Sequence, residues 1–323
     1  MSTSLRRVTV TDSLDLLAPG IDLLRSEGVE VLELALGIDP MDAAASASSS
    51  QAIIVGVLEV AEQSLALLAA GSPKLIVRAG IGYDNVDVLA AHRHGIEVAN
   101  VPDYCTDEVA DHTLMLLLAA ERRLTTLRDL GRESWNVAAR LPPVHRLRGR
   151  TLGLVGFGRI GQQVALRAAP FGYRVVAADP DAPESVFTAH GVDRVDIDEL
   201  FRTADAISLH CPLSAETNLI VNARRLEMMK SGATLVNTSR GGLVNLDDVN
   251  DAVASGRLGS VALDVLDGEP AAPLGHPLLQ RPEVLITPHV AWYSLDARRE
   301  LAIKSAEEVL RSLRGEPLRN AIP

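Results

Sequence analysis

Three ionisable side chains in the C-terminal third of the chain could together perform acid–base chemistry on a small anion. His289 follows the apolar pair 285–286, and Glu269 precedes that pair. A histidine beside a carboxylate is the usual proton donor and acceptor near neutral pH, because the carboxylate fixes the ring tautomer. Arg240 lies in a glycine-rich segment, and a guanidinium can hold a planar carboxylate through two hydrogen bonds. Residue types alone leave two interpretations open: a catalytic trio, or three structural residues.

A glycine-rich motif, Gly-Phe-Gly-Arg-Ile-Gly at residues 156–161, indicates a second ligand. It lies between a predicted strand at 151–155 and a predicted helix at 162–169, and a second strand at 173–178 ends at Asp179. This order of strand, turn, helix, strand and acid is typical of a dinucleotide-binding fold. The glycines there allow a tight turn, close approach of the pyrophosphate and close packing of helix on strand.

Asp179 also bears on which dinucleotide binds. A carboxylate accepts both ribose hydroxyls of NAD and repels the 2′-phosphate of NADP. The next residues, Pro180 and Asp181, add no cation that could neutralise such a phosphate. NAD is therefore the expected cofactor, and an exposed carboxylate at a strand end is the simpler alternative for Asp179.

The overall composition limits the class of protein. With 323 residues, 47% of them hydrophobic, the chain is long enough for two domains. Its net charge of −11 argues against a nucleic-acid partner. Cys105 and Cys211 have no metal-ligand spacing, so we expect no metal site and a reducing, cytoplasmic environment. The longest apolar run, residues 114–120, is too short to cross a bilayer, so no membrane partner is expected.

The pattern along the chain predicts an α/β protein with two βα-repeating domains and parallel sheets. Long helices are expected at 107–123 and 295–314. The second has no strand after it to join, so we expect it to return to the first domain. The Ala/Ser-rich segment 42–51 is expected to be a helix or a loop at the surface. The predicted strands outside the dinucleotide motif are 8–10, 29–32, 53–55, 75–77, 97–99, 206–209, 234–236, 261–263 and 285–286.

Four segments place polar residues directly after predicted strands, at 78–87, 235–242, 264–270 and 286–293. In open α/β sheets the carboxyl ends of the strands form the edge where ligands bind. The sequence therefore predicts a site at this edge.

Several of these motifs resemble the D-isomer-specific 2-hydroxyacid dehydrogenases. The resemblance is carried by LVNTSRGGLVN at 235–245 and by ALDV followed by Glu-Pro at 262–270. RGRTLGLVGFGRIGQQVALRA at 148–168 and TPHVAWYS at 287–294 are most similar to the C-terminal-binding-protein-like branch and its bacterial relatives.

The resemblance implies both a fold and a reaction. A Rossmann NAD-binding domain, residues 102–292, would be inserted into a discontinuous flavodoxin-like substrate domain made of residues 1–101 and 293–323. The implied protein is an NAD-dependent oxidoreductase that moves a hydride between nicotinamide and C2 of a D-2-hydroxy acid or 2-keto acid. It would be a homodimer that assembles through the nucleotide domain.

The resemblance also implies roles for single residues. Arg240 would bind the substrate carboxylate and carbonyl, His289 would be the acid and base, and Glu269 would orient His289. Trp292 would be either a wall of the substrate pocket or ordinary packing. The other substrate-binding residues expected are Arg78, Gly80, Ile81 and Gly82. Those expected to contact NAD are Gly156, Phe157, Gly158, Arg159, Ile160, Gly161, Asp179, Cys211, Pro212, Thr217, Thr238, Asp264 and Thr106.

Two other functions stay open at this point. The first is an NAD(H)-sensing, corepressor-like scaffold, because such proteins keep the same arginine, glutamate and histidine. The second is a dehydrogenase that acts on a phosphorus-containing acid, although no residue points to such a substrate directly.

Overall fold

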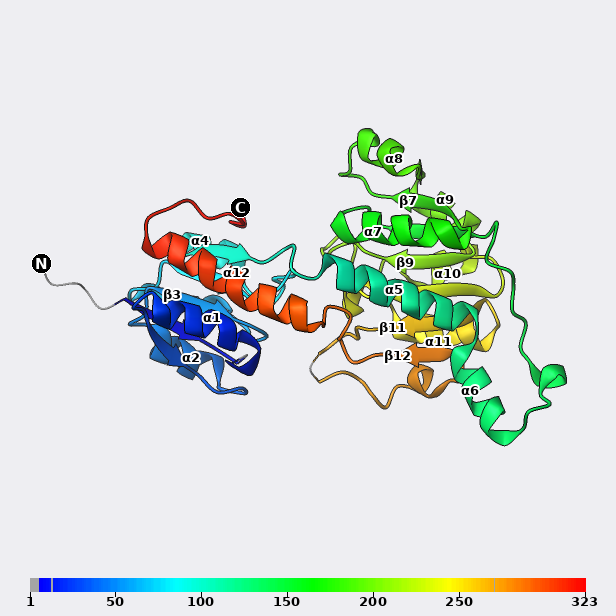
Figure 1. Cartoon of the computed structure of the whole chain (residues 1–323), viewed down its shortest axis with the longest axis horizontal. Helices are drawn as coiled ribbons and strands as arrows, with labels where there is room; N and C mark the ends of the chain where they lie inside the picture. Colours follow the sequence, from blue (N-terminus) through cyan, green and yellow to red (C-terminus); the bar gives the residue numbers. More distant parts are fainter. Residues whose placement is uncertain (1–5, 13, 270) are drawn as a thin grey trace, which may run out of the picture. The chain divides into compact units, whose positions relative to one another are not determined.

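The computed structural model describes residues 6–12, 14–269 and 271–323. The chain forms two compact units, the first made of Met1–Cys105 with Ser294–Pro323 and the second of Thr106–Tyr293. Each unit is built around one parallel sheet, as the alternation of apolar strands and amphipathic helices predicts (Figure 1). Across the described residues, no helix combines the length and the apolar character that crossing a bilayer requires.

The first unit contains a five-stranded parallel sheet in the order β2-β1-β3-β4-β5. This is the flavodoxin-like order. Its strands are β1 (Arg7–Val10), β2 (Glu30–Glu33), β3 (Ala52–Val55), β4 (Leu75–Arg78) and β5 (Glu97–Asn100). Its helices are α1 (Leu14–Ser26), α2 (Pro40–Ala47), α3 (Glu62–Ala69), α4 (Val88–Arg93) and α12 (Leu295–Leu313).

Helix α12 returns to the first unit and packs beside α1 (Figure 1). The two helices approach closely at Gly20, where an added Cβ would lie 2.2 Å from the carbonyl oxygen of Ala302. Helix α2 covers most of the segment that was expected to be a helix or a loop. Asp39 caps it by accepting hydrogen bonds from the amides of Met41 and Asp42, and Pro40 begins it.

The second unit contains a seven-stranded parallel sheet in the order β12-β11-β10-β9-β6-β7-β8. Its strands are β6 (Thr151–Val155), β7 (Arg174–Ala178), β8 (Asp193–Arg194), β9 (Ala206–Leu209), β10 (Ala233–Asn237), β11 (Leu258–Leu263) and β12 (Val284–Ile286). Its α-helices are α5 (Thr106–Glu121), α6 (Leu124–Glu133), α7 (Arg159–Ala168), α8 (Glu184–His190), α9 (Ile197–Thr203), α10 (Ala223–Met228) and α11 (Leu246–Ala254). Short 3₁₀ helices are η1 (Ala138–Arg140), η2 (Ala169–Phe171), η3 (Gly241–Leu243) and η4 (Pro277–Gln280).

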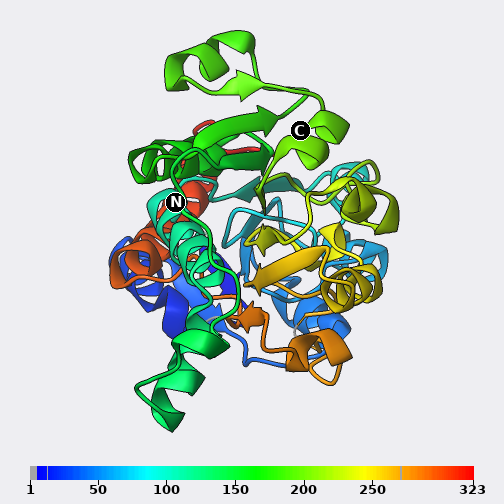
Figure 2. The ribbon, with the colours of Figure 1, turned by 90° about the vertical axis from the view of Figure 1, so that its right-hand side faces the viewer.

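Successive residues of these strands point to opposite faces of the sheet, and each face has its own apolar core. Leu152 and Leu154 of β6 pack with α5 and α7 on one face, whereas Val155 packs with α9, α10 and α11 on the other. Figure 2 shows helices on both sides of the sheet. The chain leaves β6 toward β7 and later returns to the other side of β6 as β9, so the strand order reverses between β6 and β9. A reversal of this kind marks where ligands bind in open α/β sheets.

Candidate active site

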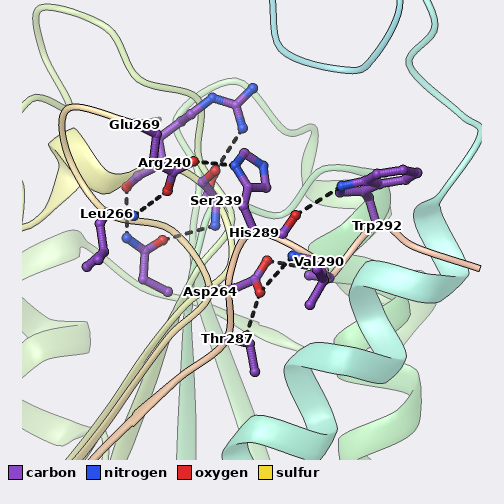
Figure 3. Close-up of polar contacts among 11 residues, drawn as sticks. Ser239, Arg240, Asp264, Leu266, Glu269, Thr287, His289, Val290 and Trp292 are labelled. Atoms are coloured by element: carbon purple, nitrogen blue, oxygen red, sulfur yellow. Dashed lines mark hydrogen bonds and ion pairs between the residues drawn. The ribbon is translucent and has the colours of Figure 1, made fainter. Parts of the chain in front are cut away.

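Three of the four polar segments predicted from the sequence, at 235–242, 264–270 and 286–293, lie at the carboxyl edge of the second unit's sheet. Because all seven strands are parallel, the loops after β6, β9, β10, β11 and β12 meet at this edge. Figure 3 shows Arg240, Glu269 and His289 gathered there from three of these loops.

His289 Nδ1 and Glu269 Oε2 are joined by a hydrogen bond, which becomes an ion pair when the imidazole is protonated. The other carboxylate oxygen of Glu269 accepts the amide of Leu266 at 2.6 Å, which fixes the orientation of the carboxylate (Figure 3). With Nδ1 held by Glu269, Nε2 is the ring nitrogen available to a ligand. This is the arrangement that positioned acid–base catalysis requires.

The pKa of Glu269 is lowered although burial works to raise it. The hydrogen bonds from His289 and from the Leu266 amide, together with the charges of His289 and Arg240, outweigh the burial. Glu269 is therefore ionised at neutral pH, as a group that stabilises a positively charged imidazole must be.

The backbone of His289 has a left-handed conformation, with φ of 51°. For a residue other than glycine, such a conformation costs about 1–3 kcal/mol and persists only where its surroundings enforce it. The His289 amide donates to the carbonyl of Asp264 at 2.7 Å, and the indole Nε1 of Trp292 donates to the His289 carbonyl at 3.0 Å. Trp292 thus fixes the His289 backbone, and its role as a substrate-pocket wall stays a prediction.

Arg240 lies in a tightly hydrogen-bonded loop after β10. The side chain of Asn237 donates to the Arg240 carbonyl at 2.8 Å and accepts the Ser239 amide at 3.0 Å. Gly241 then packs so closely that an added Cβ would lie 2.0 Å from the carbonyl carbon of Leu266. This contact places the Arg240 loop directly against the loop that holds Glu269.

Asp264 is buried and holds the loop that carries His289. Its carboxylate accepts the amides of Val290 at 3.0 Å and Ala291 at 2.9 Å. It also accepts the hydroxyl of Thr287 at 2.5 Å. These contacts give Asp264 a positioning role, and the predicted contact with NAD stays a prediction.

The glycine motif has the features that a dinucleotide needs. Gly156 has φ of 93°, and an added Cβ would lie 2.6 Å from the backbone of His210 and Cys211. Gly158 is the N-cap residue directly before α7, and an added Cβ there would meet only open space. Among the described residues, no side chain caps α7. The exposed helix N-terminus beside an open glycine suits a pyrophosphate, so the residues present fit NAD.

Phe157 and Asp179 attach this turn to the rest of the unit. The Phe157 side chain is buried and stacks on Phe187 at 4.9 Å between ring centroids, so only its backbone could touch a cofactor. The Phe157 amide donates to Asp179 at 2.7 Å, and the other Asp179 oxygen accepts the amides of Asp181 and Ala182. Carboxylate oxygens keep further acceptor capacity for ribose hydroxyls.

Arg194 is a cation near Asp179 that the sequence did not reveal. Its guanidinium donates to the carbonyls of Asp179 at 3.1 Å and Pro180 at 3.2 Å. Arg194 is distant from Asp179 in the sequence, and the pairing of β7 with β8 brings it to the same edge of the sheet.

The other residues predicted to contact NAD lie in loops or at helix starts of the second unit. Thr238 is buried, and its hydroxyl bonds that of Thr113 at 2.8 Å. The Thr217 hydroxyl donates to the Pro212 carbonyl at 2.7 Å, which closes the loop after Cys211. Burial, and to a lesser degree the charge of Asp179, raises the pKa of Cys211 to about 11, so the thiol is neutral. Arg159 and Ile160 begin α7, and Thr106 begins α5.

The substrate-binding residues predicted in the first unit lie at the end of β4 and in the loop after it. The Gly80 carbonyl accepts the amide of Val101 at 3.0 Å, and the Ile81 carbonyl accepts the side chain of Asn100 at 2.6 Å. In a planar trans peptide the next N–H points the opposite way, so the amides of Ile81 and Gly82 face away from these partners. The guanidinium of Arg78 lies over Gly80, where a Cβ would be 1.5 Å from Nη1.

Comparison with known proteins identifies the family. Residues 114–291 match the NAD-binding domain of the D-isomer-specific 2-hydroxyacid dehydrogenases. A D-3-phosphoglycerate dehydrogenase of Methanocaldococcus jannaschii is 40% identical over 251 residues, which are 77% of this chain and 47% of that protein. The chain spans about half the length of the curated relatives it matches.

Solved structures of similar proteins cover the whole fold. The TT0316 protein of Thermus thermophilus has a TM-score of 0.86 and 35% identity, over 98% of this chain and 100% of that chain. A glyoxylate reductase of Paecilomyes thermophila has a TM-score of 0.88 and 27% identity, over 99% of each chain. The predicted fold class, NAD-binding domain and family resemblance are therefore confirmed. The chain belongs to the D-isomer-specific 2-hydroxyacid dehydrogenase family.

Proposed function

We propose that this protein is an NAD-dependent oxidoreductase that interconverts a D-2-hydroxy acid and the corresponding 2-keto acid. The observation that carries the proposal is the His289–Glu269 pair beside Arg240, at the sheet edge that also bears the glycine motif. Bound NADH supplies the hydride. Relatives named for phosphoglycerate and glyoxylate support a small 2-hydroxy or 2-keto acid as substrate.

His289 is the proposed acid in the direction of ketone reduction. A proton on Nε2 would pass to the oxygen on C2 as that oxygen gains negative charge, and the neutral ring would take a proton back in the oxidative direction. Glu269, held at Nδ1, keeps Nε2 aimed outward and stabilises the charged ring.

Arg240 is the proposed anchor for the substrate carboxylate and carbonyl. Its loop is fixed by Asn237 and by the close packing of Gly241, so the guanidinium works from a rigid base. The amides of Ile81 and Gly82, with Gly80 and Arg78, are the proposed contacts from the first unit. The glycine motif, Asp179, Thr106, Cys211, Pro212, Thr217, Thr238 and Asp264 are the proposed contacts with NAD.

A panel of 2-keto acids, each followed by loss of nicotinamide absorbance with NADH, tests this function. We expect turnover of at least one small 2-keto acid, and Arg240→Lys should lower its kcat/KM. The lysine keeps the charge but loses the forked geometry, and an imperfectly paired carboxylate costs about 2–5 kcal/mol, or roughly thirtyfold or more. NADH affinity, measured by fluorescence titration, should be unchanged. Loss of NADH binding with an unchanged keto-acid KM would contradict the role of Arg240.

We further propose that the enzyme is a cytoplasmic homodimer. Helix α6 and the segment after it project from the second unit (Figure 1) and carry apolar side chains without cover. Trp135 is 98% exposed, and Leu124 and Leu141 are also exposed. A second copy of the chain is the proposed cover, since exposed apolar groups of this kind mark interfaces. Both cysteines are buried thiols, which supports a reducing compartment.

A further inference from the structure

A chain of three side chains links helix α5 to the loop of His289. His112 lies on α5, Thr287 follows β12, and Asp264 follows β11. His112 Nε2 is 3.0 Å from Thr287 Oγ1, and Thr287 Oγ1 is 2.5 Å from Asp264 Oδ1. His112 Nε2 is also 3.6 Å from the same carboxylate oxygen. Two loops and a helix thus meet at one buried carboxylate.

The direction of each hydrogen bond follows from the chemistry of its partners. An ionised carboxylate can only accept, so the single hydroxyl proton of Thr287 must go to Asp264. The Thr287 oxygen can then only accept from the imidazole. His112 must therefore carry its proton on Nε2 and donate it to Thr287.

Burial favours the neutral form of the His112 imidazole. The side chain of His112 is 16% exposed and that of Asp264 is 0% exposed. Burial lowers the pKa of His112, and the charge of Asp264 opposes the effect without overcoming it. At neutral pH the ring is the neutral tautomer that the hydrogen-bond chain requires.

We propose that His112 is a positioning residue for the reaction, acting through Thr287 and Asp264 on the loop 289–291. This inference rests on the proposed function. Asp264 holds that loop through the amides of Val290 and Ala291 and through its own carbonyl, which accepts the His289 amide. The Asp264 carboxylate can hold those amides only if its own orientation is fixed. The Thr287 hydroxyl, which the hydrogen bond from His112 orients, fixes the orientation of that carboxylate.

The left-handed backbone of His289 makes the reaction rate sensitive to these contacts. Its left-handed backbone would relax if the contacts that enforce it loosened. Relaxation would turn Nε2 away from the position set by Glu269, and misplacement of a reacting group by about 1 Å can cost a hundredfold in rate. A partial loosening should therefore lower kcat and leave cofactor binding intact.

Amide hydrogen exchange of the cofactor-free protein tests the physical link without any activity. His112→Leu removes the donor, whereas His112→Gln places an amide N–H near the position of Nε2. We expect the Val290 and Ala291 amides to exchange about fivefold faster in the leucine variant, the size that one neutral hydrogen bond gives, and to regain protection in the glutamine variant. Equal protection in the wild type and His112→Leu would overturn the proposal.

A matched control is His276→Leu. His276 is 17% exposed and pairs with a carboxylate through Nε2, at 3.1 Å from Asp247, outside the chain of three side chains. This variant should lower Tm and leave exchange at Val290 and Ala291 unchanged. If it accelerated exchange as much as His112→Leu does, general destabilisation would explain the effect and the proposal would fail.

The kinetic test uses the same variants on a 2-keto acid that the wild type reduces. His112→Leu should lower kcat about five- to tenfold with little change in the KM for NADH, and His112→Gln should restore most of kcat. An unchanged kcat, or a loss that appears only in the KM for NADH, would overturn the proposal. If no 2-keto acid is reduced by the wild type, the proposed function fails, and the exchange experiment still decides the role of His112.

Discussion

Replacing Gly241 with alanine should separate the Arg240 loop from the Glu269 loop. An added Cβ would lie 2.0 Å from Leu266 C and 2.1 Å from Asp267 N. Both atoms belong to the backbone, so neither can rotate out of the way. Because ordinary contact begins near 3.4 Å, one of the two loops must move by more than 1 Å. Leu266 also supplies the amide that orients Glu269, so the movement reaches the catalytic pair.

The size of the effect follows from this displacement. Overpacking costs about 1–3 kcal/mol, and contact with rigid backbone places Gly241→Ala near the upper value. For a domain of about 150–250 residues, this lowers Tm by about 6–12 °C. A misplacement of about 1 Å should lower kcat/KM for the keto acid by roughly a hundredfold.

The neighbouring glycine is a matched control. An added Cβ at Gly242 would lie 3.0 Å from Leu213 Cδ2 and 3.2 Å from Cδ1, which are the flexible end of a side chain. Gly242→Ala should therefore change Tm by only a few degrees and kcat/KM by less than about tenfold. Differential scanning fluorimetry and keto-acid reduction measure both. Equal effects of the two substitutions would refute the argument that the Gly241 contact sets the spacing of the loops.

Three further outcomes follow from the structure. The wild type should prefer NADH over NADPH, and Asp179→Ala should narrow that preference, because Arg194 remains to attract the 2′-phosphate; equal kcat/KM for both cofactors in the wild type would contradict this. Glu269→Gln should lower Tm at neutral pH, because a carboxyl group whose pKa is lowered by folding stabilises the fold at every pH above its ordinary pKa of 4.5. In thermal melts, the Tm difference between this variant and the wild type should shrink only as the pH falls below 4.5. A Tm difference that does not depend on pH would refute this prediction. Trp135→Ser should weaken the dimer in analytical ultracentrifugation without changing Tm at high concentration, and an unchanged dimer would refute the proposed interface.

The sequence predicted the elements that carry the site because local patterns determine them. Short apolar runs gave the parallel strands, and the order strand–turn–helix–strand–acid located the glycine motif at the edge where the structure has it. Once the strands are parallel, polar residues at their carboxyl ends must share that edge. The strand pattern therefore predicts that Arg240, Glu269 and His289 lie near one another.

Contacts between distant segments could not be predicted in the same way. His112 and Thr287 are separated by 175 residues. No sequence spacing predicts that a histidine on helix α5 contacts a threonine that follows strand β12. Arg194 reaches Asp179 only because a two-residue strand, β8, adds to the sheet edge. The positive φ of His289 is held by its hydrogen bonds with the Asp264 carbonyl and the Trp292 indole, and no residue type around His289 in the sequence indicates this conformation.

The central claim is that His289 is the acid and base of a hydride-transfer reaction. The most direct test compares reduction of a 2-keto acid by the wild type and by His289→Ala, both saturated with NADH, with NADH affinity and Tm measured on the same preparations. Loss of a general acid should lower kcat by about 10²–10⁴ while NADH affinity stays the same. A kcat close to that of the wild type, together with a lower Tm, would show that His289 only stabilises the loop, and would contradict the account.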